Sequence, residues 1–72
     1  MEMTKLDEYH LELAHEYLDR AMDCVRNKRR AKAQEHLTES ITQYSRVTRG
    51  IRDESWEEKA RKSFPLIMGS QI

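Results

Sequence analysis

Only four residues, at positions 27–30, separate two stretches of the chain whose apolar residues recur at helical spacing. A connection this short forces consecutive helices to lie side by side and antiparallel. Its first residue, Asn27, is of a type that tolerates the left-handed conformation closing many helices. The sequence therefore predicts an all-α fold built on an antiparallel helical hairpin, with helices at 4–26 and 31–49 and a turn at 27–30.

The first predicted helix carries a wide apolar side. Thr4 followed by Asp7 indicates an N-cap with an acid three positions on. Apolar residues then recur on one side of the helical wheel: Leu6, Leu13, Ala14, Tyr17, Leu18, Ala21, Cys24 and Val25. Leu11 and Met22 widen this side to roughly half the circumference. One neighbouring helix cannot cover that much surface, so we expect at least two neighbours.

The second predicted helix carries a narrower stripe with small residues that allow close approach: Ala33, Leu37, Ser40, Ile41, Tyr44 and Val47 or Thr48. The pair Arg49-Gly50 is typical of a helix end. A second interpretation stays open, in which the helix continues through Gly50, because one glycine inside a helix costs only ~1 kcal/mol.

A short third helix is predicted at 55–64. Ser55 and Glu58 fit a capping box at its start, and Pro65 is expected to end it. We thus predict one helical domain over 1–64 and an apolar tail over 65–72. The tail has no clear period, so it either packs across a groove or frays.

Chain length and cysteine count limit how this fold is stabilised. A chain of 72 residues makes one domain with a modest core. Its single cysteine, Cys24, excludes an intramolecular disulfide and fits a reducing, cytoplasmic setting. The start of the chain does not resemble a signal peptide, and no run approaches the ~20 apolar residues of a membrane span. We expect self-association into a helical-bundle dimer. The candidate self-association or partner face is Leu11, Leu18, Met22, Trp56, Phe64 and Leu66.

The charges are separated along the chain although the net charge is zero. Residues 1–25 hold two basic residues against seven acids, which gives −5, and residues 26–34 hold five basic residues and no acid, which gives +5. The basic residues form what we call the basic tip of the hairpin: Arg26, Lys28, Arg29, Arg30 and Lys32. The basic tip either contacts phosphates or an acidic partner, or it keeps the turn soluble while Arg26 and Lys28 offset a helix dipole.

Acidic residues line the other side of the first helix: Glu8, Glu12, Glu16, Asp19 and Asp23. This acidic face either meets a basic partner or is a solvated helix surface. Glu16 and Arg20 are spaced for a favourable i,i+4 pair, worth a few tenths of a kcal/mol. In contrast, Glu8, Glu12 and Glu16 form a like-charge ladder that costs stability.

Metal binding and catalysis find little support in the sequence. His10 and Cys24 share a face but lie ~21 Å apart along a helix, at 1.5 Å per residue. His10 fits a residue at the edge of the core, and Cys24 fits a small buried hydrophobe. We find no Gly-rich phosphate loop, nucleophile elbow or HExxH motif, and the carboxylates lie on an open face without a pocket to tune them. No cofactor, metal or enzymatic activity is expected.

Part of the predicted hairpin resembles one tetratricopeptide repeat, a helical hairpin that binds peptides in stacked arrays. The residues that carry the resemblance are small and apolar positions with matching spacing: Tyr17, Arg20, Ala21, Cys24, Ala33, Leu37, Ser40 and Ile41. The sequence departs from that family at Lys28, where the repeat usually has glycine, and it lacks the proline at the end. One such hairpin cannot bury its own faces. We carry over no site residue from it.

For function, the sequence favours a small non-enzymatic protein-interaction or regulatory protein, of adaptor or inhibitor type, that presents a helix face to a partner protein. Small, highly charged chains without motifs are frequent among phage and mobile-element accessory proteins, which is an association with a size class. The alternative is a nucleic-acid-binding regulator that contacts phosphates through the basic tip. The hairpin needs completion by its own C-terminal segment, by another copy or by a partner.

Overall fold

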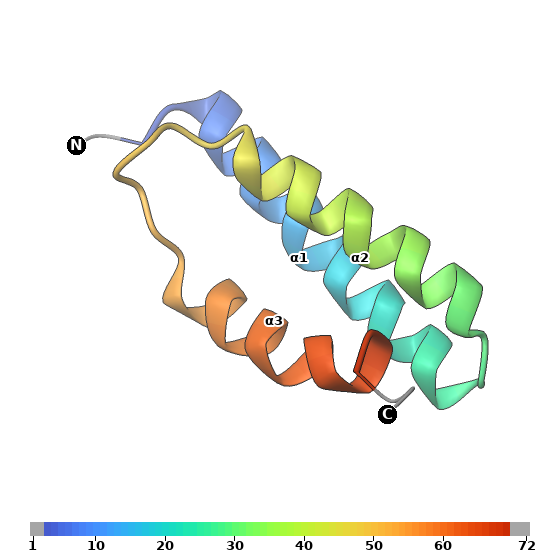
Figure 1. Ribbon diagram of the computed structural model, residues 1–72. Coiled ribbons are helices and arrows are strands. Elements are labelled where there is room, and N and C mark those ends of the chain that lie inside the picture. The colour runs from blue at the N-terminus through green and yellow to red at the C-terminus, as the bar shows by residue number, and fades with distance from the viewer. Residues whose placement is uncertain (1–2, 70–72) are drawn as a thin grey trace.

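The computed structural model describes residues 3–69 of the chain, and these residues form three helices without a strand. They are α1 (Lys5–Arg26), α2 (Arg30–Ser45) and α3 (Glu54–Ile67). α1 and α2 pack as the predicted antiparallel hairpin, and α3 runs back along its side toward the turn (Figure 1). The resulting shape is elongated, with extents of 40 × 18 × 15 Å.

The hairpin is held by a seam of alternating small and large side chains. On α1 the buried residues follow one another at steps of four and three: Asp7, Leu11, Ala14, Leu18 and Ala21. α2 contributes Ala33, Leu37 and Ser40 at the same steps. This spacing keeps one stripe of each helix facing its neighbour, and the alanines let the two backbones approach closely.

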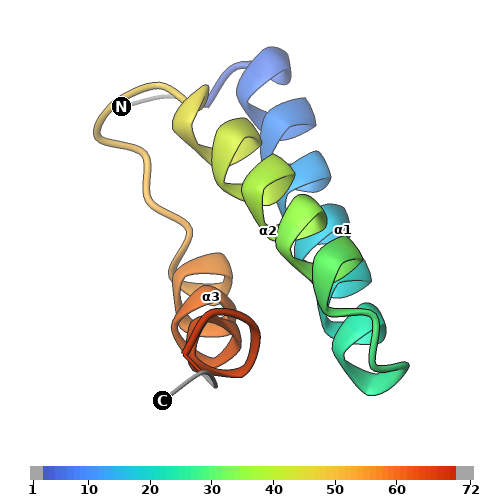
Figure 2. The same cartoon turned by 45° about the vertical axis from the view of Figure 1, so that its right-hand side comes forward.

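The third helix supplies the second neighbour that the sequence requires for the first. Its buried residues, Trp56, Ala60, Ser63 and Ile67, again follow steps of four and three. Trp56, Ala60 and Ile67 join the core cluster of the hairpin. Figure 2 shows α3 along one side of the hairpin, reached from α2 through the extended segment 46–53. The chain's own C-terminal part therefore completes the hairpin.

The predicted end of the second helix at residue 49 is wrong, and a carboxylate explains why. α2 ends at Ser45. The N–H groups of Arg46 and Val47 donate to the carbonyls three residues earlier, those of Gln43 and Tyr44, instead of four residues earlier as in an α-helix. The backbone N–H of Thr48 then donates to Asp7 Oδ1 at 3.0 Å instead of extending the helix. Since Asp7 lies 41 residues away along the chain, local sequence could not reveal this competitor.

The third helix is longer at both ends than the predicted 55–64. It begins at Glu54, with Asp53 as the N-cap in place of the expected Ser55 box, and Asp53 Oδ1 accepts from the N–H of Trp56 at 3.1 Å. It also continues past Pro65 to Ile67. Proline has no backbone N–H, so one helix carbonyl in the preceding turn has no donor, but Pro65 is exposed and water can reach that carbonyl. Continuing the helix past Pro65 buries Ile67 in the core, which favours the extra residues. The predicted tail thus begins later, and its residues 70–72 lie outside the described chain.

Burial also corrects the predicted self-association face. Leu11, Leu18 and Trp56 are at most 8% exposed inside a single chain. They are therefore not available for pairing between copies, and the bundle dimer stays a prediction that needs other residues. Conversely, Leu6, predicted on the apolar side of the first helix, is 63% exposed.

One buried hydroxyl links the three helices. Ser40 on α2 is fully buried and donates to the backbone carbonyl of Ala14 on α1. Its oxygen accepts from Trp56 Nε1 on α3 at 2.8 Å. The Trp56 ring also stacks on Tyr44 of α2, with ring centroids 4.0 Å apart and planes 8° apart. The indole therefore reaches the core with its N–H satisfied, as burial of a tryptophan requires.

Replacing Ser40 with alanine is expected to destabilise the fold by about 1–3 kcal/mol, because the indole N–H of Trp56 stays buried but loses its hydrogen-bond acceptor. In a Trp56→Phe background the same substitution should cost less, since the donor is already gone. Urea unfolding of the wild type, the two single variants and the double variant measures both effects. Ser45→Ala, an exposed serine on the same helix, should change stability by less than about 0.5 kcal/mol. Equal costs in the two backgrounds would contradict the proposed hydrogen bond.

Candidate functional site

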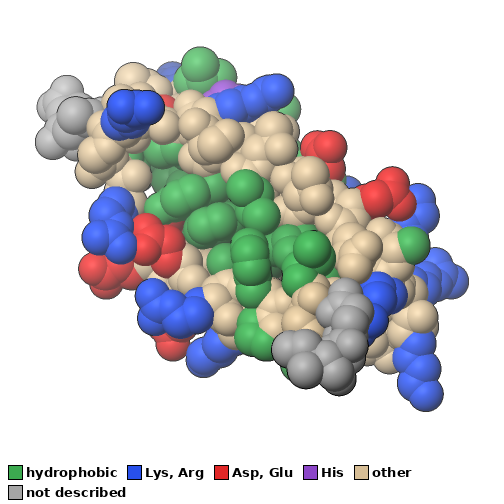
Figure 3. Space-filling model, viewed as in Figure 1, with side chains coloured by type: hydrophobic (Ala, Val, Ile, Leu, Met, Phe, Trp, Pro, Cys, Tyr) green, Lys and Arg blue, Asp and Glu red, His purple; other side chains and the backbone are tan. Residues whose placement is uncertain are grey.

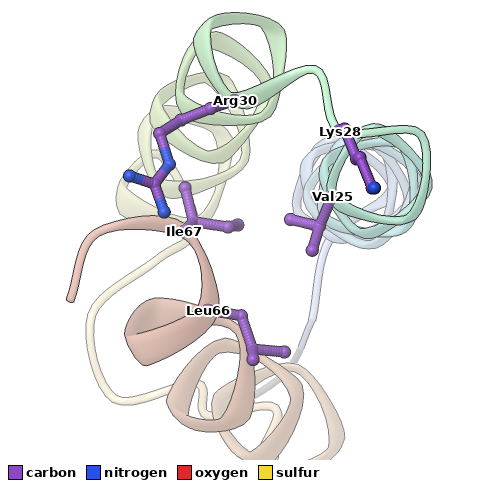
Figure 4. Close-up of a pocket in the computed structure, with 5 residues that line it drawn as sticks. All are labelled: Val25, Lys28, Arg30, Leu66 and Ile67. Carbon is purple, nitrogen blue, oxygen red and sulfur yellow. The ribbon is translucent and has the colours of Figure 1, made fainter. Parts of the chain in front are cut away.

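The candidate site lies at the turn end of the bundle, where the end of α1, the start of α2 and the end of α3 meet. A hollow of about 270 Å³ opens there. Figure 4 shows its lining: Val25 from α1, Lys28 from the turn, Arg30 from α2, and Leu66 and Ile67 from α3. We call this the tip hollow. It combines an apolar floor with a basic rim.

The turn is fixed by hydrogen bonds to the last turn of α1. The N–H groups of Asn27, Lys28 and Arg29 donate to the carbonyls of Asp23, Val25 and Cys24. The left-handed residue is Lys28, with φ of 60°, and not the expected Asn27, which has φ of −93°. A side chain in that conformation is strained, which is why glycine usually stands there. The Lys28 side chain lies on the rim of the hollow.

The five residues of the basic tip separate into two groups. Arg26 pairs with Asp23 at 2.7 Å, and Lys32 approaches Glu35 at 3.9 Å. Lys28, Arg29 and Arg30 have no carboxylate within 4.0 Å among residues 3–69. Arg29 and Arg30 also stand at the N-terminus of α2, which has neither a side-chain cap nor an acid in its first turn. Cations there oppose the helix dipole, so these arginines do not stabilise α2.

The predicted acidic face does lie on the exposed side of α1, since all five of its residues are exposed. Three of them have cationic partners. Glu16 forms the predicted pair with Arg20 at 3.2 Å, Asp19 meets Lys59 of α3 at 3.4 Å, and Asp23 meets Arg26. These exposed pairs contribute little stability individually. They also reduce the charge that this face can offer to a basic partner.

The residues of the predicted self-association or partner face also separate into buried and exposed groups. Besides the three that the core buries, Met22 is half-buried beside Lys59 and Ser63 between α1 and α3. Phe64 and Leu66 remain 42% and 50% exposed, and their neighbour Met68 is 49% exposed. Figure 3 shows hydrophobic side chains gathered between α2 and α3, with Lys and Arg side chains at the end where the turn lies. Exposed apolar residues and basic residues thus share one end of the molecule.

A second polar cluster at the other end was not foreseen from the sequence. The carboxylate of Asp7 is buried and accepts from the N–H of Thr4 and from the N–H and hydroxyl of Thr48. The sequence predicted the Thr4–Asp7 capping box, which is confirmed, but not the contact with Thr48. Hydrogen bonds from the backbones of Thr48 and Thr4 lower the pKa of Asp7 below its usual 3.8. Asp7 therefore anchors the segment between α2 and α3 as a carboxylate.

The start of α3 is held by charged and polar contacts with both other helices. His15 Nε2 on α1 lies 2.8 Å from Asp53 Oδ2. The Tyr44 hydroxyl accepts from the N–H of Asp53 and donates to Glu57 Oε2 at 2.9 Å, and Arg52 also donates to Glu57. The bonds from Arg52, then from Tyr44, lower the pKa of Glu57 from 4.5 to about 2. Every member of this cluster has a partner within it, and together these contacts hold the start of α3 against α1 and α2.

The pKa of Asp53 is lowered as well. Burial acts to raise it, but the hydrogen bonds from His15 and from the N–H of Trp56 outweigh that effect. The other two histidines have partners on the neighbouring helix: His10 lies 2.9 Å from Gln43 Oε1, as fits a core-edge residue, and His36 stacks on Tyr17. Cys24 is half-buried against the core.

Two further observations bear on chemistry. Within the part of the chain that the structure describes, no three His, Cys, Asp or Glu side chains gather in a way that could hold a metal ion. Over the same residues, no helix combines the length and the apolar character needed to cross a membrane. Comparisons of the chain with protein-family models, with curated proteins and with solved structures found no match.

The lowered pKa values predict acid sensitivity with a definite sign. A carboxyl group whose pKa is lower in the folded state contributes stability above its unfolded pKa and loses it as the pH falls. The free energy of unfolding should therefore fall from about pH 4.5 to about pH 2, the window set by Glu57. Glu57→Gln and Arg52→Gln should each flatten this fall. Urea unfolding at pH 7, 4.5, 3 and 2 tests it, and curves parallel to the wild type would contradict the assignment.

Proposed function

We propose that this chain is a non-enzymatic protein-interaction protein of adaptor or inhibitor type, which binds a partner protein at the turn end of its bundle. The observation that carries the proposal is the exposure of Phe64, Leu66 and Met68 at the C-terminal end of α3, where Leu66 also lines the tip hollow. Contiguous apolar patches on a protein surface commonly mark sites of protein interaction. Phenylalanine and methionine are also enriched at protein interfaces.

The fold gives an independent reason for this assignment. The same chain buries Trp56, Ala60 and Ile67 of α3 almost completely, so α3 is docked and its exposed residues are not a consequence of poor packing. Moreover, α3 continues through Pro65 to present Leu66 and Met68 at the tip. A surface formed by a rigid helix end and a fixed turn is pre-organised, which lowers the entropic cost of binding.

The proposal predicts that a random twelve-residue peptide library, panned on the immobilised protein, yields binders that depend on Phe64 and Leu66. Phe64→Ser with Leu66→Ser should weaken those binders at least tenfold, or about 1.4 kcal/mol, as loss of central apolar contacts does. Leu6→Ser is the matched control, since Leu6 is exposed on α1 near the opposite end of the bundle. Circular dichroism verifies that each variant is folded. Binders that tolerate the double substitution would place the interaction elsewhere.

A second candidate function, nucleic-acid binding, is favoured by the three cations of the basic tip that lack a carboxylate partner, Lys28, Arg29 and Arg30. Three phosphate contacts imply that log affinity falls with log salt at a slope of about −2.7. Affinity for a fluorescent DNA duplex should then drop about 40-fold between 50 and 200 mM salt. Fluorescence anisotropy measures it, with Arg29→Glu plus Arg30→Glu as the variant. Binding that this variant retains would exclude the tip as the nucleic-acid contact.

A further inference from the structure

We infer that the partner segment recognised at the tip hollow is an acidic peptide, which places one apolar side chain in the hollow and carboxylates against its rim. This inference rests on the proposed function and names the chemistry of the partner. The occupant follows from three properties of the hollow: its size, its floor and its unpaired charge.

The hollow is large enough for one side chain of a partner, with a volume of about 270 Å³. Its floor is apolar, with Ile67 buried, Val25 half-buried and Leu66 half-exposed. Figure 4 shows Val25 facing the α3 residues across the opening. An aliphatic or aromatic side chain entering there would cover apolar surface on both helices.

The rim sets the charge of the partner. Lys28 and Arg30 line the hollow, and neither has a carboxylate within 4.0 Å among residues 3–69. The two acids closest to them in sequence, Asp23 and Glu35, already lie beside Arg26 and Lys32. An arginine guanidinium binds a carboxylate through two parallel hydrogen bonds. Carboxylates that flank the apolar side chain of the peptide would therefore form ion pairs with Lys28 and Arg30.

The apolar floor also favours a peptide over a nucleic acid. A sugar–phosphate backbone would use the cations alone and would leave Val25, Leu66 and Ile67 without a contact. A peptide that alternates apolar and acidic residues uses the floor and the rim together. The helix dipole favours an anionic partner in general, because Arg30 stands at the uncapped N-terminus of α2, where negative charge is favoured.

The experiment uses two synthetic twelve-residue peptides with the same leucine and phenylalanine positions and with all other residues either Glu or Lys. Titration is followed by backbone amide NMR of the full chain. The Glu peptide should shift signals of residues 25–30 and 64–68 and bind at least tenfold more tightly than the Lys peptide. The variant Lys28→Glu plus Arg30→Glu should reverse that preference. It should remain folded, because acids at the start of α2 match the helix dipole.

The matched control is Arg46→Glu plus Arg49→Glu, which changes the net charge equally in the exposed segment that follows α2. It should keep the preference of the wild type for the Glu peptide. Equal binding of both peptides, binding of neither, or an equal effect of the control variant would overturn the inference. If neither charged peptide bound while library peptides still depended on Phe64 and Leu66, the inference would fail and the proposed function would stand.

A nucleic-acid occupant has its own signature in the same variants. DNA binding that Lys28→Glu plus Arg30→Glu abolishes, and that Leu66→Ser leaves within twofold, would show that the rim acts without the floor. That outcome, together with no response to the Glu peptide, would mean that the partner at the tip is a nucleic acid and not an acidic peptide. The expected result differs in the response to the Glu peptide, which binds the wild type and which Leu66→Ser weakens at least fivefold.

Discussion

The hydroxyl group of Ser40 is the point on which this three-helix arrangement depends. It donates to a carbonyl of α1 and accepts from the only tryptophan of the chain, on α3. A small protein has little core to spare, and α3 contacts the hairpin over a limited surface. The buried indole is therefore its main anchor, and the indole can be buried only because Ser40 accepts its N–H. Larger residues at position 40 would fill the space where α1 and α2 approach.

The candidate site depends on that anchor through the rigidity of α3. Trp56 fixes the start of the helix, where Asp53, Tyr44 and Glu57 also converge, and Ile67 fixes its end beside the turn. Between them the helix carries Phe64 and Leu66 into a defined position on the surface. Without a docked α3 the tip would keep its arginines but would lose Leu66 and Ile67 from its apolar floor. A protein-binding tip and a nucleic-acid-binding tip therefore differ in whether they need α3.

The sequence predicted the features that are local. A four-residue connection between two periodic stretches sufficed for the hairpin, Thr4 and Asp7 for the first cap, and the width of the apolar side for the second neighbour. What it missed depends on distant contacts. The N–H of Thr48 donates to Asp7 instead of to a helix carbonyl, and Ile67 is helical beyond Pro65 because the core buries it. The steps of four and three shared by all three helices were a usable signal for Asp7 and Ser40, since both polar residues occupy seam positions. The basic tip was visible in sequence, but its apolar floor was not, because Val25 and Leu66 are brought together only by the fold.

The central claim, that α3 and the hairpin form one unit joined at Ser40, is tested most directly by comparing two probes of urea unfolding. Trp56 fluorescence reports the docking of α3, and far-ultraviolet circular dichroism reports all three helices. We expect both transitions to coincide, with the same midpoint and slope, as in two-state unfolding. A fluorescence transition that precedes the loss of helical signal would show that α3 leaves an intact hairpin, and it would contradict the account.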